Sequence, residues 1–301
     1  PDGTYSFAIE STDKAGNRGS SNRAVFELDT TETPVSLAAE YDAFSPDRDN
    51  IKDSVDLILQ PTVTEGIESW NVTVYSESGR NVRRFDGRKN IPGLVRWDGK
   101  TDEGTLAAEG GYTASLTVRY RHGNVSTASS GSFILDVTDP DASISADYEI
   151  FSPNDDGNKD HITFFHTTST EQLWLGVVKD SSGRTVKSFI WTGNAPDEVT
   201  WDGRGDEKMM VPDGEYRYRI ESTDRAGNTI TTPDLLFAID TEEKPVFLSA
   251  GYDALSPNGD GVKDTISLIP QLKIDQGIDS WILQVEKENG QTVYESIGEG
   301  T

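Results

Sequence analysis

The sequence repeats itself with a period of a little over one hundred residues. Three Ser-Pro pairs, at Pro46, Pro153 and Pro257, are separated by 107 and 104 residues. A Trp-Asp-Gly triplet recurs at Trp97 and Trp201, again 104 residues apart. This period is too long for a solenoid unit and matches one self-contained domain. The chain is therefore predicted to be a tandem array of domains.

Acidic segments that contain Thr and Pro close each repeat, at residues 29–34, 136–140 and 240–245. Short polar stretches of this kind are typical of linkers. They divide the chain into the C-terminal strands of one domain (1–33), two whole domains (34–139 and 140–242) and the N-terminal half of a further domain (243–301). We name these parts the N-terminal segment, repeat one, repeat two and the C-terminal segment.

One loop is predicted to differ in length between the two whole repeats. Trp174 follows Pro153 by 21 positions, whereas Trp70 follows Pro46 by 24. Because the other landmarks keep their spacing, the three-residue difference indicates a shorter loop in repeat two.

The repeats carry the period-two pattern of β-strands. In repeat two, Tyr216, Tyr218 and Ile220 alternate with charged residues, which predicts a strand with one buried and one solvated face. No segment carries a helical stripe. The pattern predicts an all-β fold of tandem immunoglobulin/fibronectin-III-like β-sandwich domains. About seven strands are expected in repeat two, at residues 143–147, 161–167, 173–179, 185–191, 198–201, 215–223 and 235–240.

Composition excludes several classes of function. The chain has 27 Lys and Arg against 52 Asp and Glu, a net charge of −25, which opposes binding to nucleic acid and to anionic lipid surfaces. No apolar run is long enough to span a membrane, so direct membrane insertion of this fragment is not expected. Cysteine is absent, so the fold must depend on burial and backbone pairing.

A Tyr follows a tight Gly turn once in every repeat, at Tyr5, Tyr112 and Tyr216. This resembles the tyrosine corner of immunoglobulin-like sandwiches, in which the hydroxyl bonds to upstream backbone. The order Trp-Asp-Gly, Pro-Asp-Gly-x-Tyr, Asp-x-Ala-Gly-Asn resembles the Ig-like domain of bacterial flagellar hook-capping proteins. The Ser-Pro-Asn-x-Asp-Gly-x-x-Asp loop resembles one that recurs in bacterial surface and gliding-motility proteins. The resemblance implies an exported bacterial β-sandwich and no chemistry.

An acidic loop after each Ser-Pro pair contains the candidate metal ligands. Side-chain oxygens recur at relative positions one, three and seven around a sharp bend at Gly157 and Gly261, and alternating oxygens of this kind are typical of calcium loops. Asn50 replaces this Gly in repeat one, where we expect the left-handed conformation that Asn adopts best among non-Gly residues. The same residues also suit Asx turns, in which the last Asp accepts backbone N–H bonds. We favour the turn and keep calcium as the alternative. The candidate ligands are Asp47, Asp49 and Asp53, then Asn154, Asp156 and Asp160, then Asn258, Asp260 and Asp264.

No catalytic or cofactor-binding residues are predicted. A solvated, repeated loop does not provide the paired carboxylates in separate environments that acid–base catalysis needs, and no nucleophile motif or phosphate loop is present. Trp97 and Trp201 are predicted to be core or rim aromatics and not sugar-stacking platforms. His122, His161 and His166 are expected to be ordinary surface or strand residues.

The leading hypothesis is a non-enzymatic, extracytoplasmic structural spacer or adhesion scaffold of bacterial origin, whose partners are other domains of the same parent chain. One alternative is a set of carbohydrate- or protein-binding modules in a larger secreted enzyme or adhesin, with a surface protein or glycan as partner. A further alternative is a flagellar or secretion-apparatus component.

Overall fold

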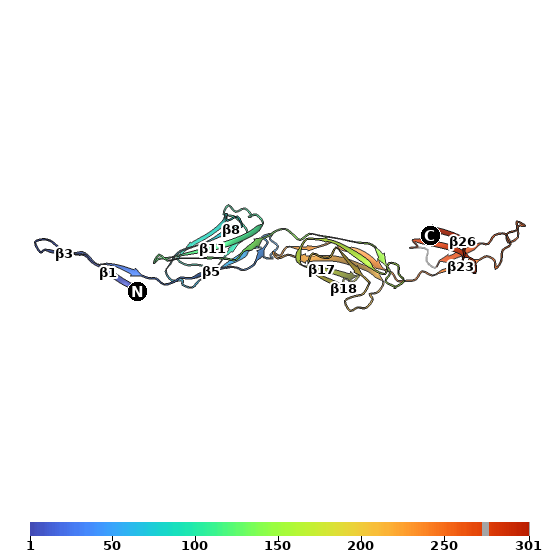
Figure 1. Ribbon diagram of the computed structural model, residues 1–301, viewed down its shortest axis with the longest axis horizontal. Coiled ribbons are helices and arrows are strands. Elements are labelled where there is room, and N and C mark those ends of the chain that lie inside the picture. The colour runs from blue at the N-terminus through green and yellow to red at the C-terminus, as the bar shows by residue number, and fades with distance from the viewer. Residues whose placement is uncertain (273–276, 301) are drawn as a thin grey trace.

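The computed structural model describes residues 1–272 and 277–300. Every regular element in this part of the chain is a β-strand, and the four parts follow one another along one line (Figure 1). Residues 273–276 and 301 of the predicted C-terminal segment lie outside the described residues. None of the described residues forms a helix long and apolar enough to cross a membrane.

Repeat one folds into two β-sheets. The smaller sheet has the strand order β10-β7-β5, and the larger has the order β6-β13-β11-β8-β9, with β12 beside β11. The two-residue strand β6 pairs parallel with β13, and the other pairs are antiparallel. The strands are β5 (Val35–Ala39), β6 (Ala43–Phe44), β7 (Val55–Pro61), β8 (Ile67–Ser76), β9 (Asn81–Arg88), β10 (Leu94–Trp97), β11 (Gly110–Tyr120), β12 (Val125–Ser129) and β13 (Phe133–Leu135). The predicted all-β, immunoglobulin-like sandwich is confirmed.

Repeat two has the same topology, with sheets β14-β16-β19 and β15-β22-β20-β17-β18 and with β21 beside β20. Its strands are β14 (Ala142–Ala146), β15 (Ile150–Phe151), β16 (Ile162–Thr168), β17 (Glu171–Asp180), β18 (Thr185–Gly193), β19 (Glu198–Trp201), β20 (Gly214–Thr223), β21 (Thr229–Thr231) and β22 (Leu235–Ile239). Repeat two, all of which the structure describes, has nine strands, two more than the seven that the sequence predicted. The prediction missed β15 and β21, because strands of two and three residues are too short to show alternation.

The shorter loop predicted in repeat two lies between β16 and β17. Residues 169–170 make this connection, whereas residues 62–66 connect β7 to β8 in repeat one. The difference of three residues is therefore confined to one loop, and it leaves the two sandwiches otherwise equivalent.

Among the described residues, each terminal segment forms two separate two-stranded sheets. The N-terminal segment contains β1 (Gly3–Phe7), β2 (Glu10–Thr12), β3 (Arg18–Ser20) and β4 (Ala24–Leu28), with β1 paired to β4 and β2 to β3. The C-terminal segment contains β23 (Val246–Ala250), β24 (Leu268–Leu272), β25 (Ser280–Glu286) and β26 (Thr292–Glu299), with β23 paired to β24 and β25 to β26. Large apolar side chains of both segments, such as Phe26 and Trp281, are exposed.

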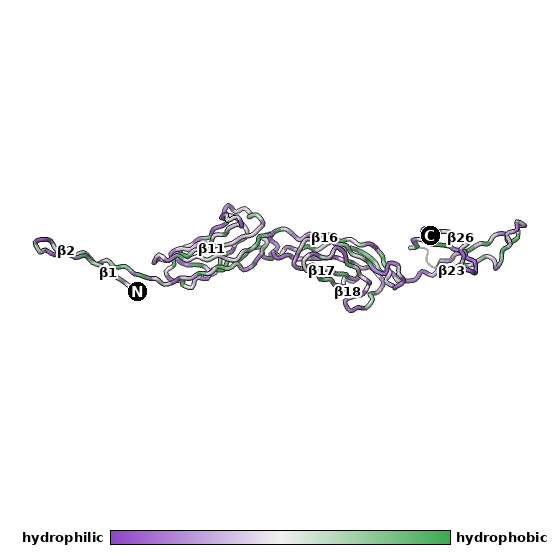
Figure 2. The backbone as a smooth tube through the Cα atoms, viewed as in Figure 1, coloured by the Kyte–Doolittle hydropathy of each residue, from purple (hydrophilic) through white to green (hydrophobic). Residues whose placement is uncertain are grey.

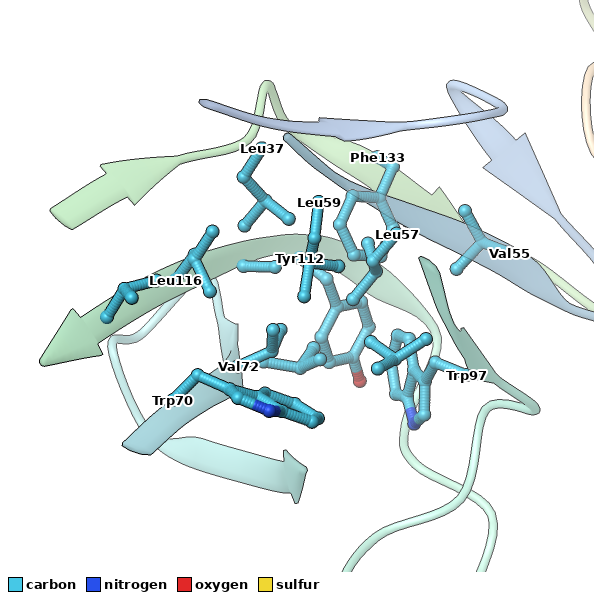
Figure 3. Packing of buried hydrophobic residues seen from close by; sticks show 14 of the residues in the cluster. Leu37, Val55, Leu57, Leu59, Trp70, Val72, Trp97, Tyr112, Leu116 and Phe133 are labelled. Atoms are coloured by element: carbon cyan, nitrogen blue, oxygen red, sulfur yellow. The ribbon is translucent and has the colours of Figure 1, made fainter. Parts of the chain in front are cut away.

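Each complete repeat has its own hydrophobic core between its sheets. Alternate residues of β11 and β20 point inward, as the predicted period-two pattern requires, and Tyr216, Tyr218 and Ile220 are all buried. Figure 3 shows the core of repeat one, where Trp97 and Tyr112 come from different sheets and lie together. Hydrophobic residues follow the strands, and the connecting loops are largely hydrophilic (Figure 2).

The two Trp-Asp-Gly tryptophans are core residues, as predicted. Trp97 is 0 % and Trp201 2 % exposed, so neither ring offers a face to a sugar. Each indole Nε1 donates a hydrogen bond of 2.8 Å to the backbone carbonyl three residues later, at Lys100 and Arg204. This bond satisfies the indole N–H inside the core and closes the turn that follows the strand.

The tyrosine corner is present in all three copies. The hydroxyl of Tyr216 donates to the carbonyl of Pro212 at 2.5 Å, that of Tyr5 donates to the carbonyl of Pro1 at 2.5 Å, and that of Tyr112 donates to the carbonyl of Ala108. The bond always spans four residues, which fixes the entry of the chain into the long strand at the Gly turn.

Repeat two buries a polar pair that repeat one lacks. His166 of β16 is 6 % exposed, with its Nδ1 2.7 Å from the carbonyl of Pro196 and its Nε2 2.7 Å from the hydroxyl of Tyr218. A neutral ring with the proton on Nδ1 satisfies both contacts, because Nδ1 donates and Nε2 accepts. Leu59 and Ala114 hold the equivalent positions in repeat one.

This pair should make repeat two sensitive to mild acid. Burial lowers the pKa of His166 below its ordinary value, so the unfolded chain binds a proton more readily than the folded one. The contribution of His166 to the free energy of unfolding is therefore complete above pH ~6.5. It is lost as the pH falls through the folded pKa, with a slope of up to about 1.4 kcal/mol per pH unit.

Thermal unfolding between pH 7 and pH 5 tests this expectation. In the wild-type chain, the melting temperature of repeat two should fall as the pH is lowered. The double variant His166→Leu with Tyr218→Ala, which has the residues of repeat one at these positions, should lose that dependence on pH. A wild-type transition that stays constant over this range would contradict the assignment.

Candidate functional site

The acidic loop at one end of each sandwich turns by placing three alternate residues in the left-handed conformation. We call residues 44–53, 151–160 and 255–264 the SP loops. In repeat one the left-handed residues are Arg48 (φ 76°), Asn50 (φ 73°) and Lys52 (φ 51°), which confirms the expectation that Asn50 replaces Gly. The equivalent residues are Asp155, Gly157 and Lys159 in repeat two and Gly259, Gly261 and Lys263 in the C-terminal segment.

The last Asp of each loop holds this conformation in place. The carboxylate of Asp160 accepts backbone N–H bonds from Asp155 at 2.8 Å and from Gly157 at 2.8 Å. Asp53 accepts the equivalent bonds at 2.7 and 3.1 Å, and Asp264 accepts them at 2.9 and 2.8 Å. Left-handed residues turn these N–H groups toward one point, where a carboxylate is a strong acceptor. The predicted turn role of the last Asp is confirmed.

The remaining candidate ligands form Asx turns with one another. In repeat two the amide oxygen of Asn154 accepts the N–H of Asp156 at 3.1 Å, and Asp156 in turn accepts the N–H of Asn158 at 2.8 Å. The amide nitrogen of Asn154 donates to Asp156 at 3.0 Å. Asn258 and Asp260 repeat these bonds in the C-terminal segment. In both loops the Asn directs its amide donor, and not only its oxygen, at the neighbouring Asp.

The SP loop of repeat one has a different donor set. It contains Asp47 where the other loops have Asn, and oxygen atoms of Asp47, Asp49 and Asp53 lie within 4.8 Å of one another. Among the described residues these are the His, Cys, Asp or Glu side chains close enough to share one metal ion. The structure therefore separates the three predicted sites into one cluster of three carboxylates and two loops bonded through an Asn amide.

The SP loops of the two complete repeats are fixed to their sandwiches by their prolines. A Cβ atom on Gly99 would lie 2.7 Å from Cγ of Pro46, and one on Gly203 would lie 2.9 Å from Cγ of Pro153. Both glycines also have positive φ, of 73° and 78°. The Gly of Trp-Asp-Gly is thus required by the turn and by the close approach of the proline, which explains why the two motifs recur together.

A lysine and a tyrosine lie side by side at the same end of each repeat. The ammonium of Lys52 lies 5.4 Å from the ring centroid of Tyr41. The equivalent distance is 5.0 Å for Lys159 over Tyr148 and 5.1 Å for Lys263 over Tyr252. These cation–π contacts hold three ammonium groups in the same place on the three copies.

The SP loop of repeat one contacts a hairpin of repeat two. We call residues 13–17, 120–124 and 224–228 the Gly-Asn hairpins, after their shared last two residues. The guanidinium of Arg225 pairs with the carboxylate of Asp42, and the ammonium of Lys52 donates to the carbonyl of Arg225 at 2.7 Å. A Cβ atom on Gly227 would lie 2.8 Å from Cγ2 of Ile51. We call this contact between the two repeats the joint.

A buried amide completes the joint. The amide nitrogen of Asn228, a residue 1 % exposed, donates to the carbonyl of Asp136 at 3.1 Å and to the carboxylate of Asp224 at 2.7 Å. Burial raises the pKa of the Asp136 carboxyl, and the carboxylates of Asp224 and Glu109 act in the same direction. The joint therefore depends on hydrogen bonds inside a negatively charged contact.

The ion pair of the joint is a modest source of stability. The hydrogen bond from Arg225 lowers the pKa of Asp42 below its ordinary value. The side chains of Arg225 and Asp42 are 50 % and 62 % exposed, so solvent screens the pair and its contribution is at most about 1 kcal/mol.

The Gly-Asn hairpin of repeat one makes a related contact with the N-terminal segment. Asn124 donates its amide N–H to the carbonyl of Thr31 at 3.0 Å. His122 lies 3.1 Å from Glu27 and 3.3 Å from Asp29. Asn124 and Asn228 thus reach the chain that precedes their own repeat, which accounts for Gly-Asn in repeat one although the Asp of the motif is replaced there by Tyr120.

The sequence contains the motifs of the hairpins and of the SP loops, but it does not show that the two meet. The available signal was the Gly-Asn pair of repeat one, because an Asn kept without its capping Asp must have another partner. The predicted nine ligands remain in three separate loops, one on each copy, and do not converge on a common cleft (Figure 1).

The two complete repeats match known sequence families. Residues 48–121 match the FlgD Ig-like domain, and residues 178–241 match a family described as bacterial Ig-like domain. No curated protein matches the chain. The likeness of the SP loop to those of surface and gliding-motility proteins stays an expectation.

Several solved structures are similar to the chain. A tetra-tandem repeat from the extending region of a large adhesion protein is 18 % identical, with 99 % of this chain and 70 % of that chain covered and a TM-score of 0.32. A structure concerning host cell surface retention of a 1.5-MDa bacterial ice-binding adhesin is 12 % identical, with 91 % and 98 % covered and a TM-score of 0.39. The fibronectin(III)-like modules of Clostridium thermocellum CbhA are 14 % identical, with 68 % and 92 % covered and a TM-score of 0.35.

The family matches fall on the two sandwiches whose topology, tyrosine corners and Trp-Asp-Gly turns were described above. The chain therefore carries tandem bacterial Ig-like domains that resemble the FlgD Ig-like domain.

Proposed function

We propose that the chain is a length of non-enzymatic, extracytoplasmic spacer in a bacterial surface or secreted protein, where it separates or presents other domains of the same parent chain. The observation that carries this proposal is the end-to-end order of the repeats. The chain enters each sandwich at one end and leaves at the other, and the joint forms between the facing ends (Figure 1).

Three further properties support a spacer. The cores of the two repeats are separate, so each domain adds length without needing the other for burial. The linker at residues 136–140 is short, and the joint holds its two sides together. The net charge of −25 favours solvation and opposes collapse of the array upon itself. Bacterial Ig-like families also agree with a location outside the cytoplasm.

Small-angle X-ray scattering of the chain tests the spacer. A compact protein of 301 residues has a radius of gyration of about 19 Å. Because two sandwiches and two terminal segments lie along one line, we expect a value at least about half as large again, with the pair-distance distribution of a rod. A radius near that of a compact particle would contradict the proposal.

We also propose that calcium, if the array uses it, binds at the SP loop of repeat one. Asp47, Asp49 and Asp53 supply three hard oxygen donors within 4.8 Å of one another. The loops of repeat two and of the C-terminal segment each direct an Asn amide N–H at the equivalent Asp. The Asn154, Asp156 and Asp160 set and the Asn258, Asp260 and Asp264 set are therefore weaker candidates.

Calorimetry of metal-free chain during calcium titration tests this site. Calcium at ten to a hundred times its Kd should stabilise repeat one by about 1 to 3 kcal/mol and raise its melting temperature. Asp49→Asn should abolish the shift, and Asp156→Asn, the matched change in repeat two, should leave it. The absence of a shift at millimolar calcium would leave the turn as the role of this loop.

A further inference from the structure

We propose that the SP-loop end of every repeat is a docking surface for the Gly-Asn hairpin of the repeat that follows it, so that the joint between repeats one and two is the recurring lock of the array. This inference rests on the proposed spacer and specifies how its units are joined. The occupant is an Ig-like repeat of the same kind. The joint between repeats one and two is complete among the described residues.

The docking surface recurs in the two copies that have no hairpin against them among the described residues. Its parts in repeat one are Asp42, which pairs with Arg225, and Lys52, which bonds to the Arg225 carbonyl. Repeat two has Glu149 and Lys159 at these positions, and the C-terminal segment has Asp253 and Lys263. All three lysines are left-handed and lie over the equivalent tyrosine ring, at 5.4, 5.0 and 5.1 Å.

The shape of the surface recurs with its charges. The last Asp of each SP loop binds two backbone N–H groups in the same way, and the carbonyl of each lysine accepts the N–H of the loop serine. These serine bonds measure 3.1 Å for Ser45, 2.9 Å for Ser152 and 2.9 Å for Ser256. The ammonium that binds the hairpin in repeat one is therefore already positioned in the other two copies.

The hairpin side recurs as well. The residue that follows the first hairpin position is basic in every copy, as Lys14, Arg121 and Arg225. It faces an acidic residue of the preceding repeat in the completed joint. An acidic residue on each SP-loop end and a basic residue on each hairpin give a head-to-tail contact that repeats along the chain.

The other two hairpins have the conformation of the docked one or keep its contact residue. Asp13 accepts the N–H of Asn17 at 2.8 Å, as Asp224 accepts that of Asn228 at 2.9 Å. Asn124 donates to the carbonyl of Thr31 on the preceding segment, as Asn228 donates to that of Asp136. The amide contact to the preceding chain is thus present at two successive boundaries.

Spin-label distance measurements in the full chain test the lock. Because the chain has no native cysteine, labels attach only to introduced ones, at Thr113→Cys in β11 and Glu215→Cys in β20, which are exposed strand positions of the two repeats. The labelled parent should give one narrow distance distribution. Asp42→Ala or Arg225→Ala should widen it toward the spread of a free five-residue linker, about 12 Å.

Charge exchange separates the ion pair from other causes of widening. The double variant Asp42→Arg with Arg225→Asp should restore the narrow distribution. Arg184→Ala, which removes the exposed ion pair with Asp180 inside repeat two, is the matched control and should change nothing. A broad distribution in the parent, or an unchanged one in both alanine variants, would overturn the lock.

Transplanting residues from the other copies tests whether their surfaces can dock. Asp42→Glu with Ile51→Asn places the residues of repeat two (Glu149 and Asn158) in the joint, and Arg225→Lys places there the residue of the N-terminal hairpin. Both variants should keep the narrow distribution, and widening in either would refute the general rule. An elongated particle in the scattering experiment, together with a broad distance distribution in the labelled parent, would agree with the spacer and contradict only the lock.

Discussion

The conformation of each SP loop depends on the hydrogen bonds that its last Asp accepts from backbone N–H groups. A loop with three left-handed residues, none of which is Gly in repeat one, is unfavourable unless something binds the N–H groups that it turns inward. Asp53, Asp160 and Asp264 each bind two of them. In the two complete repeats this loop places the proline against the Trp-Asp-Gly turn. In all three copies it places the lysine over its tyrosine.

The proposed function depends on where this loop lies. It sits at the end from which the chain leaves one sandwich, and the Gly-Asn hairpin sits at the end by which the chain enters the next. The contacts are polar and partly exposed, so they orient neighbouring domains without merging their cores. Such a joint suits the proposed spacer, because it would restrain bending while each domain keeps its own stability.

The sequence was sufficient for features that repeat locally, and insufficient for pairs that meet across the fold. Alternation in Tyr216, Tyr218 and Ile220 predicted the strands and their buried face, and Asn50 was correctly predicted to be left-handed. Arg48 and Lys52 gave no such signal, because their residue types do not favour that conformation. His166 was expected to be an ordinary residue, and its burial against Tyr218 depends on the pairing of distant strands.

A single sequence does not predict the joint, for a related reason. Its partners Asp42 and Arg225 are 183 positions apart, and linker composition indicates only that two domains are connected. What the sequence did contain was the recurrence of acidic, lysine and Gly-Asn positions in each copy. The completed joint shows which of these positions contact one another.

The last Asp of an SP loop shapes the surface that orients the next repeat. Spin-label distances across the joint in Asp53→Ala and Asp160→Ala address it directly, because both variants lose the same backbone bonds but only Asp53 lies at the completed joint. We expect the distance distribution to widen in Asp53→Ala and to stay unchanged in Asp160→Ala. An unchanged distribution for Asp53→Ala, or equal widening in both, would contradict it.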